Sequence, residues 1–414
     1  MVPTEMRAGS ASDAVDGVVP RQVIEPASAS ELGIALASAS RDRLATIIRG
    51  GGTKIDWGRP PVTVDLVIST ARLDNTIVHR HGDLTATVHA GITLRRLNQE
   101  LARYGQWLPI ESAFDEATIG GIVASNDAGP LRHRYGTPRD LLIGVNLAMA
   151  DGRLVKAGGH VVKNVAGYDL GRLISGSFGT LAVIVDATFK LLPIPQASAT
   201  LVASYTDAER LAHDAALIAA SQVEPLAFDV RVSAVDAWPT GSTTHDSCQL
   251  LLRLASSPSA VDAQIESVRR LALPDSQVMA GEAESSVWKE QARLPWADVG
   301  AVVRVAWPPA KLAEVITLIR ELQQMAGGRV SMVGRVGAGA GLLRIEGDDL
   351  TQSAVVRRLR SSVFVGNVTV LRGSRDLKRL VDVWGEPTAS MKVLQSLKRS
   401  LDPAGILNAG RGPI

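Results

Sequence analysis

Three consecutive glycines at the end of an apolar run constrain the fold of this chain more than any other feature. The run Leu44–Ile48 predicts a buried strand, and it leads directly into the hexapeptide Arg49–Lys54, which reads RGGGTK. Glycine has no Cβ, so the main-chain N–H groups of such a turn can face inward and approach a diphosphate closely. We therefore predict a phosphate-binding turn after this strand, with an ordinary flexible turn as the alternative.

The same turn differs from two common nucleotide-binding motifs. Lys54 follows Thr53 rather than a glycine, so the hexapeptide is not a Walker A loop. No G-x-G-x-x-G opens a helix, so the dinucleotide fingerprint of that form is absent from the sequence.

Two further stretches combine glycines with small polar side chains. Residues 117–130 place Gly120 and Gly121 among hydroxyl and amide side chains, a composition that suits a segment lying against a flat ligand. A glycine-rich loop packed on a helix is the alternative for this stretch. In residues 163–184, Gly176 and Gly179 predict a tight turn into a buried strand whose edge could pair with an adenine.

Length and composition indicate a soluble protein of two domains. The 414 residues are 46% hydrophobic, enough for a large core, and the net charge of +2 gives no global indication of nucleic acid binding. No run approaches the ~18 apolar residues of a membrane span, so we expect a cytoplasmic protein without a transmembrane segment. Cys248 is the only cysteine, which excludes an intramolecular disulfide and an iron–sulfur cluster held by four thiolates of this chain.

Hydrophobic periodicity divides the chain into four parts and predicts an α+β fold. Residues 1–20 are expected to be a flexible leader, and residues 21–195 alternate short strands with helices. Residues 196–385 predict an antiparallel sheet covered by helices, and residues 386–414 contain a helix that stops at Asp402-Pro403. The expected strands are 44–48, 64–68, 84–88, a hairpin of 141–150 with 154–157, 226–232, 249–254, 302–306, 330–336, 342–346 and 368–371. The expected helices are 93–103, 208–220, 260–272, 310–325, 350–359 and the segment that aligns Leu394, Leu397 and Leu401.

Four motifs in a fixed order resemble the PCMH-type FAD-binding domain of the vanillyl-alcohol-oxidase family. They are Gly50–Thr53, Thr118–Gly121, the stretch Lys163–Thr180 with KNVAGYDL and FGT, and the tail Leu401–Arg411, which reads LDPAGILNAGR. The resemblance implies a two-subdomain cradle for FAD, an α+β cap domain for the substrate, and a C-terminal helix and tail that return to the flavin. Within the family, KNVAGYDL and FGT look most like the FAD-binding E subunit of glycolate oxidase.

The resemblance also implies which residues meet the cofactor. Gly50–Thr53 are expected on the pyrophosphate, Val183 and Ile184 near the adenine, and Asn408 toward the flavin. Thr53 stands where covalent members of the family carry a histidine, which implies non-covalent FAD. The expected cofactor-binding residues are Arg49, Gly50, Gly51, Gly52, Thr53, Lys54, Gly91, Ala117, Thr118, Gly120, Gly121, Ser125, Asn126, Gly129, Lys163, Asn164, Gly179, Thr180, Val183, Ile184 and Asn408.

The end of the predicted strand 330–336 departs from the catalytic relatives. Those relatives carry a His-x-Gly-Asp-Gly-Asn type of loop near a metal, whereas Arg335–Gly341 reads RVGAGAG. A cation needs imidazole or carboxylate ligands, so we expect no metal site. The candidates for catalysis are Tyr135 and either Arg335 or Arg304, whose guanidinium could bind a substrate carboxylate through two parallel hydrogen bonds. Solvated or ion-paired arginines are the alternative.

The residues and the resemblance together predict the FAD-binding subunit of a glycolate-type 2-hydroxy-acid oxidase or dehydrogenase. Hydride would pass from the α-carbon of glycolate or D-lactate to flavin N5, and electrons would then pass to a partner. A separate iron–sulfur subunit and a second flavin subunit are implied, and these could hold the chain at a membrane. The alternative is a structural or electron-conducting FAD subunit that oxidises no substrate. His133, between two arginines, is a candidate base, or part of a solvated loop or a partner contact.

Overall fold

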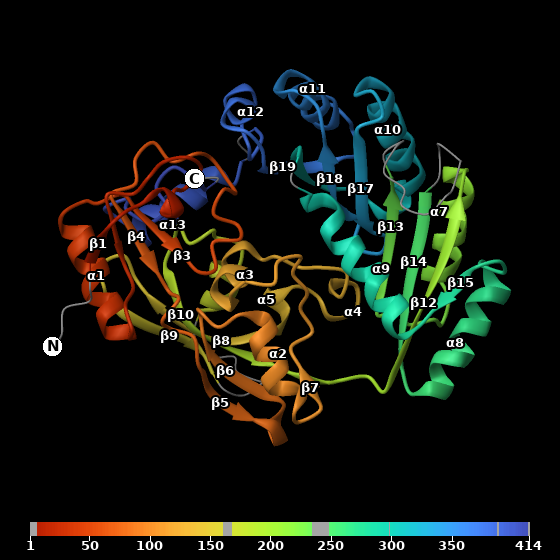
Figure 1. Ribbon diagram of the computed structural model, residues 1–414, viewed down its shortest axis with the longest axis horizontal. Helices are drawn as coiled ribbons and strands as arrows, with labels where there is room; N and C mark the ends of the chain where they lie inside the picture. The colour runs from red at the N-terminus through yellow and green to blue at the C-terminus, as the bar shows by residue number, and fades with distance from the viewer. Residues whose placement is uncertain (1–5, 160–167, 234–247, 298, 387–388, 413–414) are drawn as a thin grey trace. The chain divides into compact units, whose positions relative to one another are not determined.

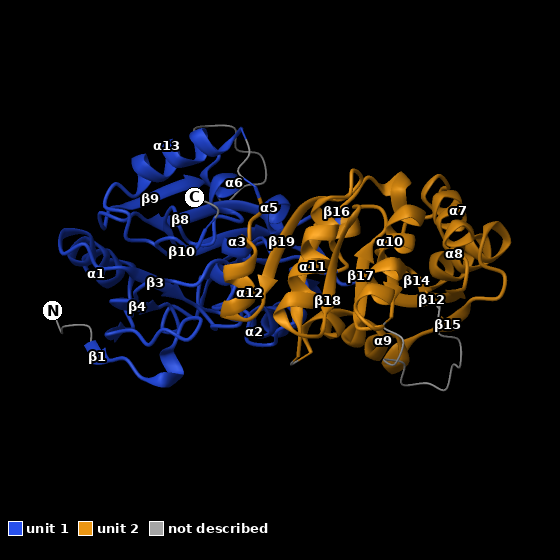
Figure 2. Ribbon diagram, turned by 90° about the horizontal axis from the view of Figure 1, so that it is seen from above, with its two compact units in different colours: residues 1–129, 135–194, 386–414 blue, residues 130–134, 195–385 orange. Residues whose placement is uncertain are grey.

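The computed structural model describes residues 6–159, 168–233, 248–297, 299–386 and 389–412. The chain forms two compact units, coloured separately in Figure 2. Unit 1 comprises residues 1–129, 135–194 and 386–414, and unit 2 comprises residues 130–134 and 195–385. Each unit contains hydrophobic clusters of its own, as expected for a chain of this length.

A four-stranded sheet forms the first part of unit 1. Its strand order is β1 (Met6–Ala8), β2 (Gln22–Ile24), β4 (Leu66–Ser69) and β3 (Thr46–Arg49). The strands β2, β4 and β3 are parallel, and α1 (Ala29–Arg41) lies in the connection from β2 to β3. Leu32 and Leu36 of α1 are fully buried in the core beneath this sheet. Strand β3 ends at Arg49, directly before the three glycines.

Residues 6–20 belong to this folded unit, so the expectation of a flexible leader is wrong for them. Strand β1 pairs antiparallel with β2, and the short helix η1 (Ala11–Asp13) follows it. Asp13 is 3% exposed, and its carboxylate accepts hydrogen bonds from Arg7 and Arg49. Val15 is fully buried. This stretch is fixed largely by charged pairs, which a search for apolar runs does not detect.

A five-stranded antiparallel sheet forms the second part of unit 1. Its strand order is β5 (Thr76–Arg80), β6 (Thr85–His89), β10 (Val183–Lys190), β8 (Leu142–Ala148) and β9 (Leu154–Gly158). The predicted hairpin is confirmed as β8 and β9, and its turn uses Gly152 at φ +86°. Helix α2 (Leu94–Ala102) begins after Thr93, whose side chain accepts a hydrogen bond from the Arg96 N–H. The shorter elements are η2 (His81–Asp83), β7 (Gln106–Trp107), α3 (Ile119–Ser125), α5 (Pro138–Leu141), α6 (Leu170–Ile174) and β11 (Leu192–Pro193), with α4 (Arg132–Tyr135) at the boundary of the units.

The C-terminal segment completes unit 1. Helix α13 (Met391–Leu401) ends before Asp402-Pro403 as predicted, and Leu407 then pairs with Thr46 of β3 in a parallel bridge. The Lys398 ammonium donates to Asp402 Oδ2 at 2.6 Å and to the carbonyls of Thr180 and Leu407. The tail therefore joins β3 to the segment that precedes β10.

Unit 2 is built on one eight-stranded antiparallel sheet (Figure 1). Its strand order is β15 (Gln277–Met279), β12 (Ala197–Tyr205), β14 (Cys248–Ser256), β13 (Ala227–Val232), β17 (Val330–Arg335), β18 (Ala340–Ile345), β16 (Ala301–Ala306) and β19 (Gly366–Arg372). The predicted α+β class is confirmed. The helices of this unit are α7 (Ala208–Ala219), α8 (Pro258–Leu271), α9 (Gly281–Arg293), η3 (Leu294–Trp296), η4 (Pro309–Lys311), α10 (Leu312–Met325), α11 (Asp349–Arg360) and α12 (Arg375–Leu380).

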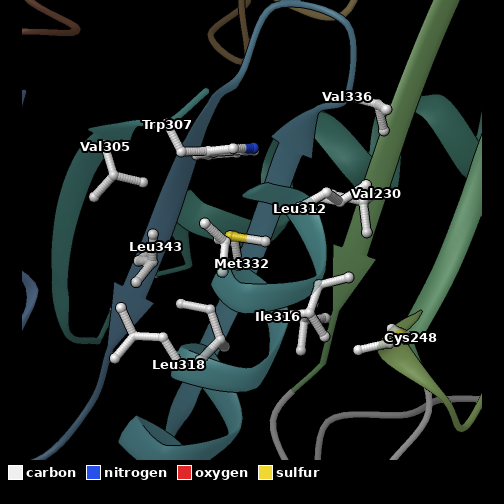
Figure 3. Close-up of a cluster of buried hydrophobic side chains, with 14 of the residues drawn as sticks. Val230, Cys248, Val305, Trp307, Leu312, Ile316, Leu318, Met332, Val336 and Leu343 are labelled. Atoms are coloured by element: carbon white, nitrogen blue, oxygen red, sulfur yellow. The ribbon is translucent and has the colours of Figure 1, made fainter. Parts of the chain in front are cut away.

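The two faces of this sheet differ in their cover. Helices α7, α8, α10 and α11 bury their apolar stripes on one face, and Figure 3 shows Met332 of the sheet between Leu343 and Ile316 of α10. On the other face, Trp288 of α9 packs against Leu251 and donates a hydrogen bond to Thr200. Side chains alternate between the faces of a strand, so the polar residues of β13, β16 and β17 lie on this second face.

Candidate cofactor site

A cleft in unit 1 gathers the glycine motifs. It encloses about 640 Å³ of empty space, part of it open to solvent, and it adjoins a second hollow of about 420 Å³. Both hollows are lined by Ile48, Gly50, Gly121, Ala124, Phe178 and Asn408. The first is also lined by Arg49, Gly51, Gly52, Thr53, Lys54, Ile55, Trp57, Thr118, Ser125 and Arg411, and the second by Thr70, Ala90, Gly120, Gly179, Ala182, Val183 and Ile184. Segments far apart in the sequence therefore line one continuous site.

The glycine turn is packed tightly against the segment that precedes α3. A Cβ at Gly50 would lie 2.1 Å from Thr118 Oγ1, and a Cβ at Gly51 would lie 1.9 Å from the Glu116 carbonyl oxygen. Gly52 has φ +73°, a conformation that side chains disfavour. Gly50 and Gly51 are thus required by close packing, whereas Gly52 is favoured by its positive φ.

The main-chain N–H groups of this turn have no partner in the described protein. Among the hydrogen bonds between described residues, none is donated by the N–H of Gly50, Gly51, Gly52, Thr53 or Lys54. All of these residues line the cleft. Main-chain N–H groups are obligatory donors, and a concave run of them favours an anion. The turn can therefore hold a diphosphate, and the site fits a dinucleotide.

Helix α3 forms another wall of the cleft. Thr118 caps the helix by accepting a hydrogen bond from the Gly121 N–H. Gly120 lies so close to Ala90 that a Cβ there would be 2.8 Å from the alanine Cβ, whereas a Cβ at Gly121 would meet only Thr118 Oγ1. Gly121 thus leaves room on the cleft side. Ser125 donates its hydroxyl to the Gly121 carbonyl.

Two cations that line the cleft are paired with aspartates. Arg49 donates to Asp13 at 3.0 Å, and Lys54 lies 3.0 Å from Asp127 Oδ2. Hydrogen bonds from Arg7, and also from Ser10 and Arg49, hold the pKa of Asp13 well below its usual range. The Lys54 ammonium also lies 5.7 Å from the ring centroid of Trp57 and 5.4 Å from that of Phe114. Both side chains are therefore held in place beside the glycine turn.

Asn408 bridges the glycine turn and the loop before β10. Its Oδ1 accepts a hydrogen bond from the Ile48 N–H at 3.2 Å, and its Nδ2 donates to the Phe178 carbonyl at 2.5 Å. The residue has φ +44°, which asparagine tolerates better than most side chains. A Cβ at Gly179 would lie 2.7 Å from its Nδ2, so Gly179 is required beside it.

The other predicted cofactor residues are placed as follows. Gly91 and Gly129 pack closely against Thr70 and Glu111, Ala117 and Thr180 are buried, and Asn126 ends α3 in the left-handed conformation at φ +48°. The Oδ1 of Asn126 is buried and has no hydrogen-bond partner in the described structure. Lys163 and Asn164 lie outside the described residues.

The predicted catalytic residues are divided between the units. Arg335 of unit 2 is 6% exposed and lies opposite Asp229 in the β13–β17 pair, with its Nε 3.9 Å from Oδ2. Burial raises the pKa of Asp229, and the guanidinium of Arg335 opposes that shift. Arg304 lies on β16 of the same unit. Tyr135 belongs to unit 1, where its ring stands edge-on to Trp107 at 6.1 Å.

The glycines on either side of Arg335 have packing partners. Aromatic or imidazole rings fill the space where three of their side chains would be. Trp307 lies 2.8 Å from a Cβ at Gly334, which precedes Arg335, and 3.0 Å from one at Gly341, and His133 lies 2.8 Å from one at Gly337. Burial, and the nearby Arg134, lower the pKa of His133. Among the described residues, no group of three or more His, Cys, Asp or Glu side chains could hold a metal ion.

Comparison with known proteins identifies the class of unit 1. The family model of the FAD binding domain matches residues 20–158, which include the glycine turn and α3. Residues 20–158 therefore belong to this family, and FAD is its cofactor. This confirms the predicted PCMH-type FAD-binding class. In the part of the chain that the structure describes, no helix has the length and apolar character needed to cross a membrane.

Two relatives with 35% identity align with the chain over only part of their length. D-lactate dehydrogenase of Archaeoglobus fulgidus is 35% identical over 171 residues, which are 41% of this chain and 38% of that protein. Glycolate oxidase subunit GlcE of Escherichia coli is 35% identical over 190 residues, which are 45% of this chain and 53% of that protein. The chain thus aligns with about half or less of these relatives. A solved structure of alkyldihydroxyacetonephosphate synthase matches 95% of this chain and 76% of its own, with TM-score 0.70 and 18% identity, which is a likeness of fold.

Several residues that line the cleft were not predicted from the sequence. Trp57 and Thr70 lie outside the glycine motifs, and nothing in their neighbours marks them. Phe178 and Arg411 lie inside two of the motifs, the FGT turn and the tail. Phe178 precedes Gly179, and Arg411 lies three residues after Asn408, and these positions are the only indication that the sequence offers.

Proposed function

We propose that this chain is an FAD-dependent oxidoreductase that oxidises a small 2-hydroxy acid such as glycolate or D-lactate. The cleft of unit 1 carries the proposal, because the N–H groups of residues 50–54, which bond to none of the described residues, line the same space as Gly121 and Asn408. Two relatives are a D-lactate dehydrogenase and a glycolate oxidase subunit, which supports this substrate class.

The chain's residues would bind FAD in two adjoining parts. The turn 50–54 would donate hydrogen bonds to the diphosphate, and Gly121 leaves space opposite it. Ala182, Val183 and Ile184 give the second hollow an apolar wall that suits a flat ring. Bound FAD supplies a hydride acceptor, while the protein orients it and limits its contact with water.

We propose that the cofactor is not covalently bound. Thr53 lies in the turn, and no histidine or cysteine is among the described residues that line the two hollows. A covalent link to the flavin needs such a nucleophile, and the threonine hydroxyl is a poor one at neutral pH. FAD would therefore dissociate when the protein is denatured.

Arg335 and Arg304 remain the proposed contacts for the substrate carboxylate. Both lie on the second face of the eight-stranded sheet, because their neighbours Val303, Val305 and Met332 belong to the core of the other face. The Nε of Arg335 lies 3.9 Å from Asp229 Oδ2 and has no hydrogen-bond partner in the described part of the chain. A guanidinium can form two parallel hydrogen bonds to a carboxylate. The catalytic role of Tyr135 stays a prediction.

The purified full chain provides the test. It is expected to absorb near ~450 nm, where oxidised flavin absorbs, and to release FAD into the supernatant after acid precipitation. Glycolate or D-lactate should then bleach this absorbance in the absence of oxygen. A colourless protein that takes up no added FAD would contradict the proposed cofactor, and flavin left in the precipitate would contradict non-covalent binding.

A second candidate function is an FAD subunit that conducts electrons without oxidising substrate. The segment Arg335–Gly341 favours it, because its glycines accommodate Trp307 and His133 and it offers no ligand for a metal. A yellow protein that dithionite reduces but neither hydroxy acid bleaches would support this candidate. In either case the single Cys248 is buried, so an iron–sulfur relay would need a partner subunit, and a second flavin subunit is proposed with it.

A further inference from the structure

The segment that follows the glycine turn is bound to the C-terminal tail. Arg411 is buried, and its guanidinium donates to the carbonyls of Ile55 and Trp57, with a distance of 2.7 Å to the latter. Arg59 returns two hydrogen bonds to the tail: its N–H donates to the Arg411 carbonyl at 3.1 Å, and its guanidinium donates to the Gly412 carbonyl at 2.7 Å. The two segments therefore hold each other in both directions.

The other end of the turn is bound to the same tail. Asn408 accepts a hydrogen bond from the Ile48 N–H, and its own N–H donates to the Thr46 carbonyl at 2.8 Å. The N–H groups of residues 50–54 form no hydrogen bond within the described protein. Main-chain contacts on both sides of the turn thus come from residues more than 300 positions away in the sequence.

We propose that Arg411 is a positioning residue for FAD, which holds residues 55–59 so that the turn 50–54 presents its N–H groups to the cofactor diphosphate. This inference rests on the proposed assignment of that turn to FAD. The planar guanidinium matches the task, because its fork can bind two carbonyl oxygens at once, which an ammonium on a flexible stem does less well. Preorganised donors bind an anion more tightly than donors that must be ordered on binding.

Arg411 also lines the cleft, so its charge could attract FAD without any effect on the turn. Burial lowers the pKa of Arg411 to about 10, and the side chain is therefore protonated at neutral pH. A lysine at this position keeps the charge and loses the fork, whereas a methionine loses both. The two substitutions thus separate positioning from electrostatic attraction.

The test compares full-length wild-type protein with R411K, R411M and a control, R399M. Arg399 is exposed on α13, and the same substitution there leaves the tail's contacts with residues 55–59 intact. Each protein is stripped of FAD and titrated with it, and the Kd is read from the quenching of flavin fluorescence. Circular dichroism of the FAD-free proteins reports their folding.

If Arg411 positions the turn, R411K and R411M both weaken FAD binding about tenfold or more, and R399M binds as the wild type does. If R411K binds FAD like the wild type, the inference is overturned and only the charge matters. Should R411M not fold, the comparison of R411K with the wild type still decides, because the lysine keeps the charge and loses the fork that binds the Ile55 and Trp57 carbonyls. Wild-type protein without affinity for FAD would instead refute the proposed function itself.

Discussion

Replacement of Lys398 by methionine should destabilise unit 1 through an unpaired buried carboxylate. The side chain of Asp402 is fully buried and accepts hydrogen bonds from the N–H groups of Ile406 and Leu407 as well as from Lys398. Removing one partner of a buried ion pair costs about 3–5 kcal/mol. Because the two N–H bonds to the carboxylate remain, we expect the lower end, about 3 kcal/mol. The substitution also removes the donor to the Thr180 and Leu407 carbonyls.

Hydrogen exchange of peptides from unit 1 measures this loss without interference from unit 2. A double-mutant cycle with D402N separates the ion pair from the lost hydrogen bonds to the Thr180 and Leu407 carbonyls, and a coupling of about 2 kcal/mol or more is expected. The matched control is K392M, because Lys392 is an exposed lysine in the same helix. A K398M protein within about 1 kcal/mol of the wild type would refute the reasoning that the buried carboxylate depends on this ammonium.

Three further predictions concern the cleft and the arginines. G51A should lose FAD almost completely, because the added Cβ would lie 1.9 Å from the main-chain oxygen of Glu116. In G52A the added Cβ meets no close atom, and the positive φ should lower the free energy of unfolding by about 1 kcal/mol. Equal FAD content in the two purified variants would contradict this. D13N should lower stability to urea at pH 7, and its difference from the wild type should shrink below about pH 4. The sign follows from the depressed pKa of Asp13, whose contribution is present above the unfolded value and is lost as the pH falls; a difference that does not depend on pH would argue against it. R335K should raise KM for the hydroxy acid about tenfold or more at unchanged FAD content, since lysine keeps the charge beside Asp229 and loses the bidentate fork. An unchanged KM would exclude Arg335 from the substrate contact.

The fold was predictable where apolar residues recur with a clear period. The strands 226–232, 249–254 and 330–336 correspond closely to β13, β14 and β17, and helix α2 begins at the predicted cap. Strand β12 was missed because Ala197–Tyr205 consists largely of Ala, Ser and Thr, which give a weak alternation. Helix α9 was missed because Trp288 is the only large apolar residue that it buries.

The site was predictable in its local part only. Glycines with their small polar neighbours are visible in the sequence, and the residues that line the cleft include Gly50, Thr118 and Asn408. Contacts across the chain are not visible, so neither the pairing of Lys54 with Asp127 nor the position of Arg411 could be foreseen. The arginines of unit 2 were chosen by chemistry alone, and Asp229 beside Arg335 emerged only from strand register.

The discontinuity of unit 1 has a consequence for how the protein is made. A ribosome completes residues 1–194 and then all of residues 195–385 before it reaches the tail that belongs to unit 1. The nascent chain therefore carries the glycine turn for most of its synthesis without the residues that bind Ile48, Ile55 and Trp57. FAD can be held firmly only after residues 408–411 have been translated, and a stop codon between residues 386 and 407 should yield protein with intact unit 2 and no flavin.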